Sequence, residues 1–509
     1  MTCPLMAAFL FLAVAEGTQA AESTTALTIY SKAGPGAVPA ELYRPGATPV
    51  GYNPQPASVP GYAIIKEERP IDLDGERTTI RYTDVASQID PTTVAFVSLT
   101  DPDTTHVIEQ NYEFDLVSAS KLMERYIDHE ITVEQAHGES IETFTGKLLS
   151  TIGGLVLQSP DGQVKIINGY SNVAFPELPG GLITRPTLVW DVVTGKPGRH
   201  NTRVTYETGG ITWWADYNAV FSEGADANSG VLELGAWVSI INRSGATYRD
   251  AKLKLIAGDV HRAPQQIQRR AYAMEMAGGA RLGQAKGFEE KSFFEYHLYT
   301  LGRPTTLPDN STKQIELFPT ASGVPCDKVL VYYGQAQRFG GYYGNPMTDR
   351  NFGVQSNSKV DIYLRFKNSK DRGLGMPLPA GRIRISKLDT ADDTLEFIGE
   401  DSIDHTPRNE ELLLKLGSAF DVVGERKQAD FKINKNRHWI DEVIEIKVRN
   451  RKEEPVEVII KETLYRWVNW KITQKTQDYE KMDSRTIHFP VRIPADGEVT
   501  VRYTVHYSW

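Results

Sequence analysis

Cysteine is nearly absent from this chain, which has 2 cysteines in 509 residues. Cys3 precedes an apolar run at the N-terminus, and Cys326 stands alone in the rest of the sequence. One remaining thiol cannot build an internal disulfide framework. The protein must therefore be stabilised by packing.

Long apolar runs are also missing beyond the N-terminus. The run at residues 5–14 is too short to span a bilayer, and no later stretch reaches the roughly 20 apolar residues of a transmembrane helix. Small residues suited to signal peptidase follow it, although no Lys or Arg precedes it. We expect a signal peptide over residues 1–20 and an exported protein, periplasmic or associated with the outer envelope, that has no transmembrane helix.

An excess of positive charge is missing as well. The formal net charge is -9, from 56 Lys and Arg against 65 Asp and Glu. Such a chain has no overall basic field to attract a phosphate backbone, so nucleic acid is a poor candidate partner. The 40% of hydrophobic residues is sufficient for packed domains and argues against disorder.

The common catalytic signatures do not occur. We find no Gly-x-Ser-x-Gly elbow, His-Glu-x-x-His pair, Walker loop or Gly-x-Gly-x-x-Gly turn. This favours binding over catalysis, and it predicts no cofactor and no metal. A site assembled from distant strands leaves no local motif, so the pattern does not exclude an enzyme. The oligomeric state cannot be read from the sequence.

The most frequent pattern in the sequence is an alternation of apolar and polar residues. Residues 360–366 and 444–449 place apolar side chains on one face and mostly charged ones on the other. This period of two is that of a half-buried antiparallel strand. Turn sequences such as residues 242–245 separate these runs. The pattern predicts an all-β, multi-domain protein built from β-sandwich modules.

Shorter strands precede these modules. The β runs between residues 130 and 168 include Gly153-Gly154 and the hairpin turn Asp161-Gly162. They predict a small SH3-like or Sm-like barrel in the N-terminal half. The expected division is a signal peptide (1–20), an N-terminal β domain (21–117), the barrel-like module (118–181), a β-sandwich (182–400) with an insertion at 263–286, and an Ig-like C-terminal β-sandwich (401–509).

The C-terminal part of the chain contains several distinctive segments in a fixed order. They are GITWWADY (210–217), residues 235–262, LGMPLPAGR (374–382), residues 398–410, GSAFDV (417–422) and Asn469-Trp470. Together they resemble the bacterial envelope proteins grouped as domain of unknown function 4139. The resemblance covers residues 182–509, and through this part alone the chain is similar to the mucoidy-inhibitor-like proteins. It implies an exported β-rich protein and supplies no catalytic residue.

Aromatic residues mark two candidate binding sites. Phe339, Tyr342 and Tyr343 lie in a Gly-rich loop at residues 339–353, a composition that suits adaptable recognition. Trp214 follows another tryptophan in a strand, and adjacent strand residues point to opposite faces, so one of the two can be exposed. Ordinary packing is the alternative at both places.

The densest polar cluster lies at residues 400–410 and includes Asp401, Asp404 and His405. Carboxylates and an imidazole can bind a metal or serve as acid and base. The spacing fits no metal loop, and a polar connection before Pro407 is the structural alternative.

Three functions remain open at this point. The leading hypothesis is a non-catalytic envelope protein that binds a protein, a glycan or a surface polymer through loops of a β scaffold. The first alternative is an envelope-acting hydrolase with an acidic site near Asp401 and Asp404. The second is an outer-membrane-associated protein, because residues 501–509 alternate and end on an aromatic residue, although a half-buried sandwich strand would do the same.

Export predicts a processed N-terminus. We expect Edman sequencing of the protein from its native host to begin at Ala21 or Glu22, because the small residues before that point suit signal peptidase. An intact Met1 on protein recovered from the cytoplasm would contradict export.

Overall fold

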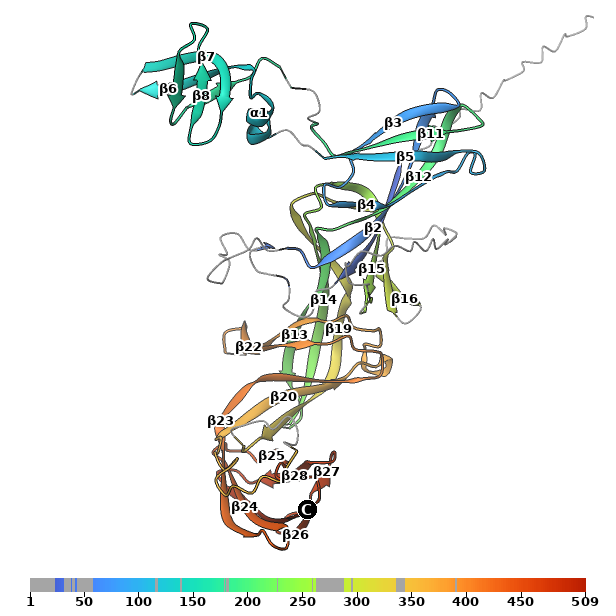
Figure 1. The fold of residues 1–509 in the computed structure, drawn as a ribbon. Coiled ribbons are helices and arrows are strands. Elements are labelled where there is room, and N and C mark those ends of the chain that lie inside the picture. Colours follow the sequence, from blue (N-terminus) through green and yellow to red (C-terminus); the bar gives the residue numbers. More distant parts are fainter. Residues whose placement is uncertain are drawn as a thin grey trace, which may run out of the picture.

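Strands make up nearly all of the regular structure in the computed structural model. It describes residues 23–31, 38, 42–43, 58–114, 118–137, 140–177, 179, 183–226, 228–258, 260–261, 288–293, 296–335, 344–389 and 391–509. The predicted signal peptide and the whole of the predicted insertion at 263–286 lie outside these residues. Within them the strands form four sheets, arranged along an elongated molecule (Figure 1). The predicted all-β class is confirmed.

The first sheet has eight strands in the order β16-β17-β15-β1-β2-β12-β4, with β18 paired to β15. The strands are β1 (Thr24–Ser31), β2 (Gly61–Leu73), β4 (Ile89–Ser98), β12 (Gly198–Thr208), β15 (Tyr248–Ala257), β16 (Phe288–Phe293), β17 (Tyr296–Leu301) and β18 (Thr305–Leu307). Strand β1 pairs in parallel with β15 and antiparallel with β2. The sheet therefore crosses the boundary that we drew between residues 21–117 and residues 182–400.

A three-stranded sheet in the order β3-β11-β5 lies next to it in Figure 1. Its strands are β3 (Arg77–Thr83), β5 (His106–Glu113) and β11 (Thr187–Val193). On the inner face, the rings of Tyr82 and Trp190 lie with centroids 4.9 Å apart. On the outer face, Arg77 pairs with Asp191. Because β5 and β11 are neighbours, everything between them in the sequence is inserted into a hairpin.

That insertion is the small module, which stands apart at one end of the molecule (Figure 1). It contains α1 (Ala119–Arg125), β6 (Glu130–His137), β7 (Ser140–Ser150), β8 (Leu155–Gln158), β9 (Val164–Ile167) and β10 (Asn172–Ala174). The Ser118 hydroxyl caps α1 by accepting a hydrogen bond from Lys121 N at 3.2 Å. Strands β8 and β9 form the hairpin predicted at Asp161-Gly162, with Gly162 at a φ of 85°.

The expected SH3-like or Sm-like barrel is an open sheet instead. Its order is β10-β6-β7-β8-β9, and among the described residues β9 and β10 do not pair with each other. Val164 and Ile166 of the edge strand β9 are 56% and 65% exposed. A closed barrel would bury one face of each strand inside, whereas here only Ile167 of β9 reaches the module's core.

The last sheet has 13 strands, and β22-β21-β13-β14-β19-β20-β23-β24-β29-β26 is its main path. Strands β25 and β28 branch from β19, and β27 pairs with β28. The bounds are β13 (Ile211–Glu223), β14 (Ser229–Asn242), β19 (Ser311–Tyr332), β20 (Lys359–Lys367), β21 (Gly381–Asp389), β22 (Thr394–Ile403), β23 (Glu411–Asn434), β24 (Trp439–Asn450), β25 (Val456–Thr463), β26 (Trp470–Lys475), β27 (Glu480–Lys481), β28 (Thr486–Ile493) and β29 (Glu498–Ser508). A short 3-10 helix spans Lys370–Arg372.

Two long strands connect the two ends of this sheet. Strand β19 has 22 residues and β23 has 24. Residues 311–327 of β19 pair with β14, and residues 326–332 pair with β20 and, at their end, with β25. Register shifts along β14 and β19 allow the sheet to bend. The predicted boundary at residue 400 therefore falls inside a continuous hydrogen-bonded sheet.

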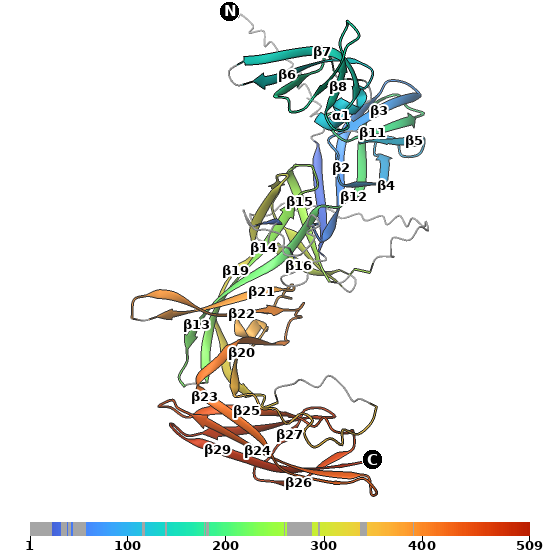
Figure 2. The same cartoon turned by 60° about the vertical axis from the view of Figure 1, so that its left-hand side comes forward.

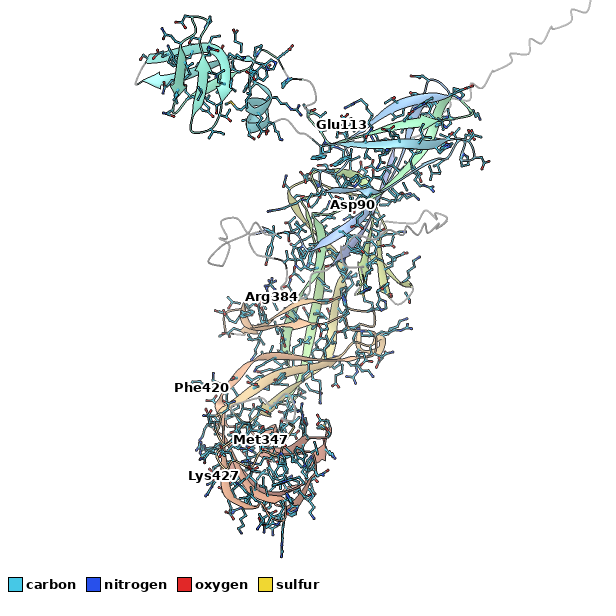
Figure 3. All side chains as sticks on the ribbon, viewed as in Figure 1. Asp90, Glu113, Met347, Arg384, Phe420 and Lys427 are labelled. Atoms are coloured by element: carbon cyan, nitrogen blue, oxygen red, sulfur yellow. The ribbon has the colours of Figure 1, made fainter. Side chains whose placement is uncertain are left out.

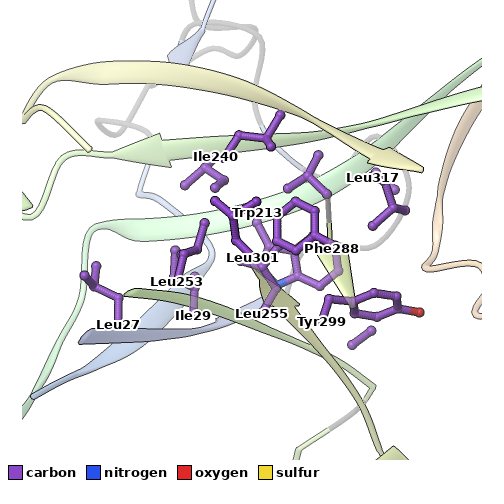
Figure 4. Close-up of a cluster of buried hydrophobic side chains, with 14 of the residues drawn as sticks. Leu27, Ile29, Trp213, Ile240, Leu253, Leu255, Phe288, Tyr299, Leu301 and Leu317 are labelled. Carbon is purple, nitrogen blue, oxygen red and sulfur yellow. The ribbon is translucent and has the colours of Figure 1, made fainter. Parts of the chain in front are cut away.

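The strands pack around two large hydrophobic cores. The first joins the eight-, three- and thirteen-stranded sheets, and Figure 4 shows part of it around Trp213 and Tyr299. The second lies in the C-terminal strands, which form the far end of the molecule in Figure 2. The predicted alternation is confirmed there, because Ile444 and Ile446 are buried, as are Tyr503 and Tyr507 of β29.

Two charged pairs are buried beside the second core. Glu442 accepts hydrogen bonds from Arg466 Nε at 3.0 Å and Nη2 at 2.9 Å. Glu462 accepts from Arg426 Nε at 3.0 Å, and the Tyr503 hydroxyl also donates to it. Each carboxylate thus has both charge neutralisation and hydrogen bonds, which burial requires.

Arg466 also ties a distant loop to the sandwich. Its Nη1 donates to the carbonyls of Met347 and Asp349 at 3.0 and 2.7 Å. Its Nη2 donates to the carbonyls of Arg350 and Phe352 at 3.3 and 3.2 Å. A single guanidinium therefore donates hydrogen bonds to four backbone carbonyls that lie outside the strands.

Removing this guanidinium should destabilise the protein strongly. For Arg466→Met we expect the free energy of unfolding to fall by about 3–5 kcal/mol, because Glu442 would be left buried and unpaired. Guanidinium chloride unfolding followed by tryptophan fluorescence measures the change. The control is Arg451→Met, whose partner Asp496 is exposed, so that only a small loss is expected. Equal losses in the two variants would contradict the role given to Arg466.

Candidate functional site

The face of the large sheet opposite the first core carries an unusual group of polar and aromatic residues. Successive side chains of strand β13 point to opposite faces of the sheet. Its odd-numbered residues 213–219 are buried in the first core. The even-numbered Trp214, Asp216 and Asn218 lie on the opposite face. As the sequence predicts, Trp213 and Trp214 therefore point to opposite sides.

Register with the neighbouring strands arranges this face in rows. Asp216 is paired with Trp237 of β14 and with Arg382 of β21. The next row runs from Glu400 through Arg384 and Asn218 to Gly235. We call the two rows the Trp237 face; its residues are Asp216, Asn218, Gly235, Trp237, Arg382, Arg384 and Glu400. The hairpin β21–β22, which supplies three of them, projects from the body of the molecule in Figure 2.

Trp237 is the exposed aromatic residue of this face, with 40% of its surface accessible. Its neighbours on the same side of β14 are Gly235 and Ser239, which are both small. Among the described residues its indole makes no aromatic contact. The sequence pattern pointed to Trp214 and not to Trp237, although the alternation of β14 places Trp237 on the face opposite the apolar Ala236 and Val238.

Asp216 is buried under this face and organises its surroundings. Its Oδ2 accepts hydrogen bonds from Trp214 Nε1 at 2.7 Å and from Ser239 Oγ at 2.9 Å. Its Oδ1 lies 3.7 Å from Arg382 Nη2 and 4.0 Å from Arg384 Nη1. These distances are too long for hydrogen bonds, and Oδ1 has no hydrogen-bond partner among the described residues. Asp216 holds both guanidinium groups in place by charge.

Arg384 is the more accessible of the two arginines. Besides Asp216 it faces Glu400, whose Oε2 lies 3.5 Å from Arg384 Nε. Asn218, in the same row, is exposed. The accessible part of the face therefore offers an amide, a guanidinium and a carboxylate beside an exposed indole.

Trp214, the predicted binding residue of this strand, is half-buried. Its ring centroid lies 5.6 Å from that of Tyr43, and it packs with Val38, Leu42 and Ile241. Its indole N–H is bound to Asp216. Trp214 thus anchors the chain before β2 and supports the carboxylate beneath the Trp237 face.

The predicted aromatic loop is described only in part. Phe339, Tyr342 and Tyr343 lie outside the described residues, so their role stays a prediction. The second half of the loop, from residue 346 to residue 353, is held by Arg466 and by the Tyr465 hydroxyl, which donates to Phe352 O at 2.9 Å. This half is part of the sandwich packing.

The acidic cluster at residues 400–410 does not converge on one point. Asp401 Oδ2 accepts a hydrogen bond from the backbone N–H of Lys415 at 2.7 Å, and Oδ1 accepts one from that of Ser402 at 2.8 Å. His405 Nδ1 accepts from Ala380 N at 3.0 Å. In the described part of the chain, no three His, Cys, Asp or Glu residues are grouped so that they could hold a metal ion. Nor do the described residues include a helix long and apolar enough to cross a membrane.

Cys326 lies on β19 in the first core and is not set up as a nucleophile. Burial, together with the nearby charge of Asp327, raises the pKa of its thiol to about 12. At neutral pH the thiol is therefore protonated, whereas the thiolate is the reactive form.

Alkylation tests this protonation state. At pH 8 we expect iodoacetamide to leave Cys326 of the folded protein unmodified, because a raised pKa lowers the thiolate fraction and the residue is buried. In guanidinium chloride its pKa returns to about 8.5 and it should react within minutes. Mass spectrometry of the peptide that contains Cys326 gives the readout. Equal labelling rates in both conditions would show that the thiol is accessible and ionisable.

No family model, curated protein or solved structure matches this chain. The resemblance to the domain of unknown function 4139 family therefore stays an expectation from the sequence motifs.

Proposed function

We propose that this chain is a non-catalytic binding protein of the bacterial cell envelope, and that the Trp237 face is its contact surface. Export is part of the proposal and follows from the N-terminal residues 1–20. From the sequence we expected loops to bind the partner. We now propose that a face of the large sheet makes the principal contact.

One observation carries the proposal: an exposed indole lies on a rigid sheet next to accessible planar polar groups. Tryptophan gives a large contact area and loses little conformational entropy on binding. Strands β13 and β14 hold Trp237 through continuous antiparallel pairing from Ile211 to Glu223. The surface is therefore preorganised, which lowers the cost of binding.

The charges of the face favour binding over catalysis. Acid–base chemistry on a glycan needs two carboxyl groups across a scissile bond, with one pKa raised. Here Asp216 is buried between two arginines, and Glu400 faces one of them. The hydrolase alternative near Asp401 and Asp404 gains no support either, because both Asp401 oxygens are occupied by backbone N–H groups.

Truncation of the indole tests the proposal. We expect the wild-type protein to co-sediment with an envelope preparation from its native host and Trp237→Ala to bind about tenfold more weakly. The melting temperature should change little, since the ring is partly exposed and touches no other aromatic ring among the described residues.

Phe420→Ala is the matched control. Phe420 is 96% exposed on β23, away from Arg384 in Figure 3, so its removal also deletes an exposed aromatic ring. This variant should bind like the wild type. If Trp237→Ala bound equally well, or if both variants lost binding to the same extent, the Trp237 face would not be the contact surface.

A further inference from the structure

The accessible row of the Trp237 face consists of planar groups that can each make two hydrogen bonds. Asn218 offers an amide, Arg384 a guanidinium and Glu400 a carboxylate, in register across three neighbouring strands. A hydroxyl group both donates and accepts, so a pair of adjacent hydroxyls matches one such planar group. Donors and acceptors therefore alternate along the row, as a polyhydroxylated ligand requires.

Gly235 ends this row next to the indole. It is the register partner of Asn218 and precedes Trp237 by two residues, so both lie on the same side of β14. A Cβ at this position would come to 3.2 Å from Thr320 Oγ1. Because glycine adds no side chain there, nothing from β14 separates a ring that lies on Trp237 from the Asn218 amide.

The charge of the face selects against anionic ligands. Arg382 and Arg384 carry two positive charges, and Asp216 and Glu400 carry two negative ones. Asp216 lies within ion-pair distance of both arginines, and Glu400 within that of Arg384. Glu316, the register partner of Trp237 on β19, is exposed and adds negative charge. The arginines thus serve as oriented hydrogen-bond donors whose charge is already compensated.

We propose that the Trp237 face binds a neutral glycan chain. The apolar face of a sugar ring packs on the Trp237 indole, and the hydroxyls of this ring and the next ones bind Asn218, Arg384 and Glu400. The four strands from β22 to β14 span about 14 Å at the usual strand spacing, which suits several linked sugars better than a single one. This inference rests on the proposed function and adds the class of ligand.

Asp216 acts in this site as a positioning residue. It is shielded by Arg382 and Arg384 and does not touch the glycan. Its charge orients the Arg384 guanidinium, while Glu400 holds the other side of that group. The Trp214 and Ser239 hydrogen bonds fix Asp216 in turn.

Native affinity electrophoresis of the full chain tests the inference. Hydroxyethyl cellulose and soluble starch are the neutral probes, and polygalacturonate is the anionic probe. We expect at least one neutral polymer to retard the wild type and polygalacturonate to leave its mobility unchanged. Trp237→Ala should raise the apparent dissociation constant about tenfold, and Asn218→Ala, an exposed position, about fivefold. Phe420→Ala should be retarded like the wild type.

Each remaining outcome separates the ligand class from the contact surface. Retardation by polygalacturonate alone would overturn the neutral glycan while leaving the Trp237 face as the contact surface. Absence of retardation in all three polymers, combined with a Trp237-dependent loss of envelope co-sedimentation, would overturn the glycan class and keep the proposed function. Retardation that Trp237→Ala and Asn218→Ala leave unchanged would overturn the site itself.

Discussion

The pairing of β13 on both of its edges is the constraint on which the rest of this structure depends. One edge is antiparallel to β14, and the other is parallel to β21, which comes from a distant part of the chain. Because side chains alternate along a strand, one register decides both faces together. It buries Trp213 and Tyr217 in the first core and sets Asp216 between Trp237 and Arg382 on the other side. A shift of one residue would exchange the core for the site.

Several carboxylates of this protein have structural roles. Asp401 supports the backbone of β23, Glu442 and Glu462 neutralise buried arginines, and Asp216 fixes two more. Buried ion pairs contribute little net stability, yet losing one partner is costly. Their benefit is a defined arrangement: Arg466 fixes four carbonyls of a loop that has no strand partner. The hydrogen bonds and ion pairs of these carboxylates are thus made within the protein.

The two long strands explain how separate cores can belong to one scaffold. Each of β19 and β23 contributes to both cores, so paired strands and their backbone hydrogen bonds join the two ends of the sheet. The small module differs, since it is inserted in the β5–β11 hairpin and has a core of its own.

The sequence by itself determined the local properties of this protein. Alternation gave the strands around Val360 and Ile444 and their buried faces, the Asp161-Gly162 pair gave a hairpin, and the scarcity of cysteine left packing as the source of stability. The same alternation separated Trp213 from Trp214 and could have revealed Trp237. The tertiary structure alone decided that β1 joins β15, that the small sheet stays open, and that Arg382 and Arg384 lie over Asp216. A period of two shows which face of a strand is buried, but strand neighbours depend on contacts between residues far apart in the chain, which no local pattern encodes.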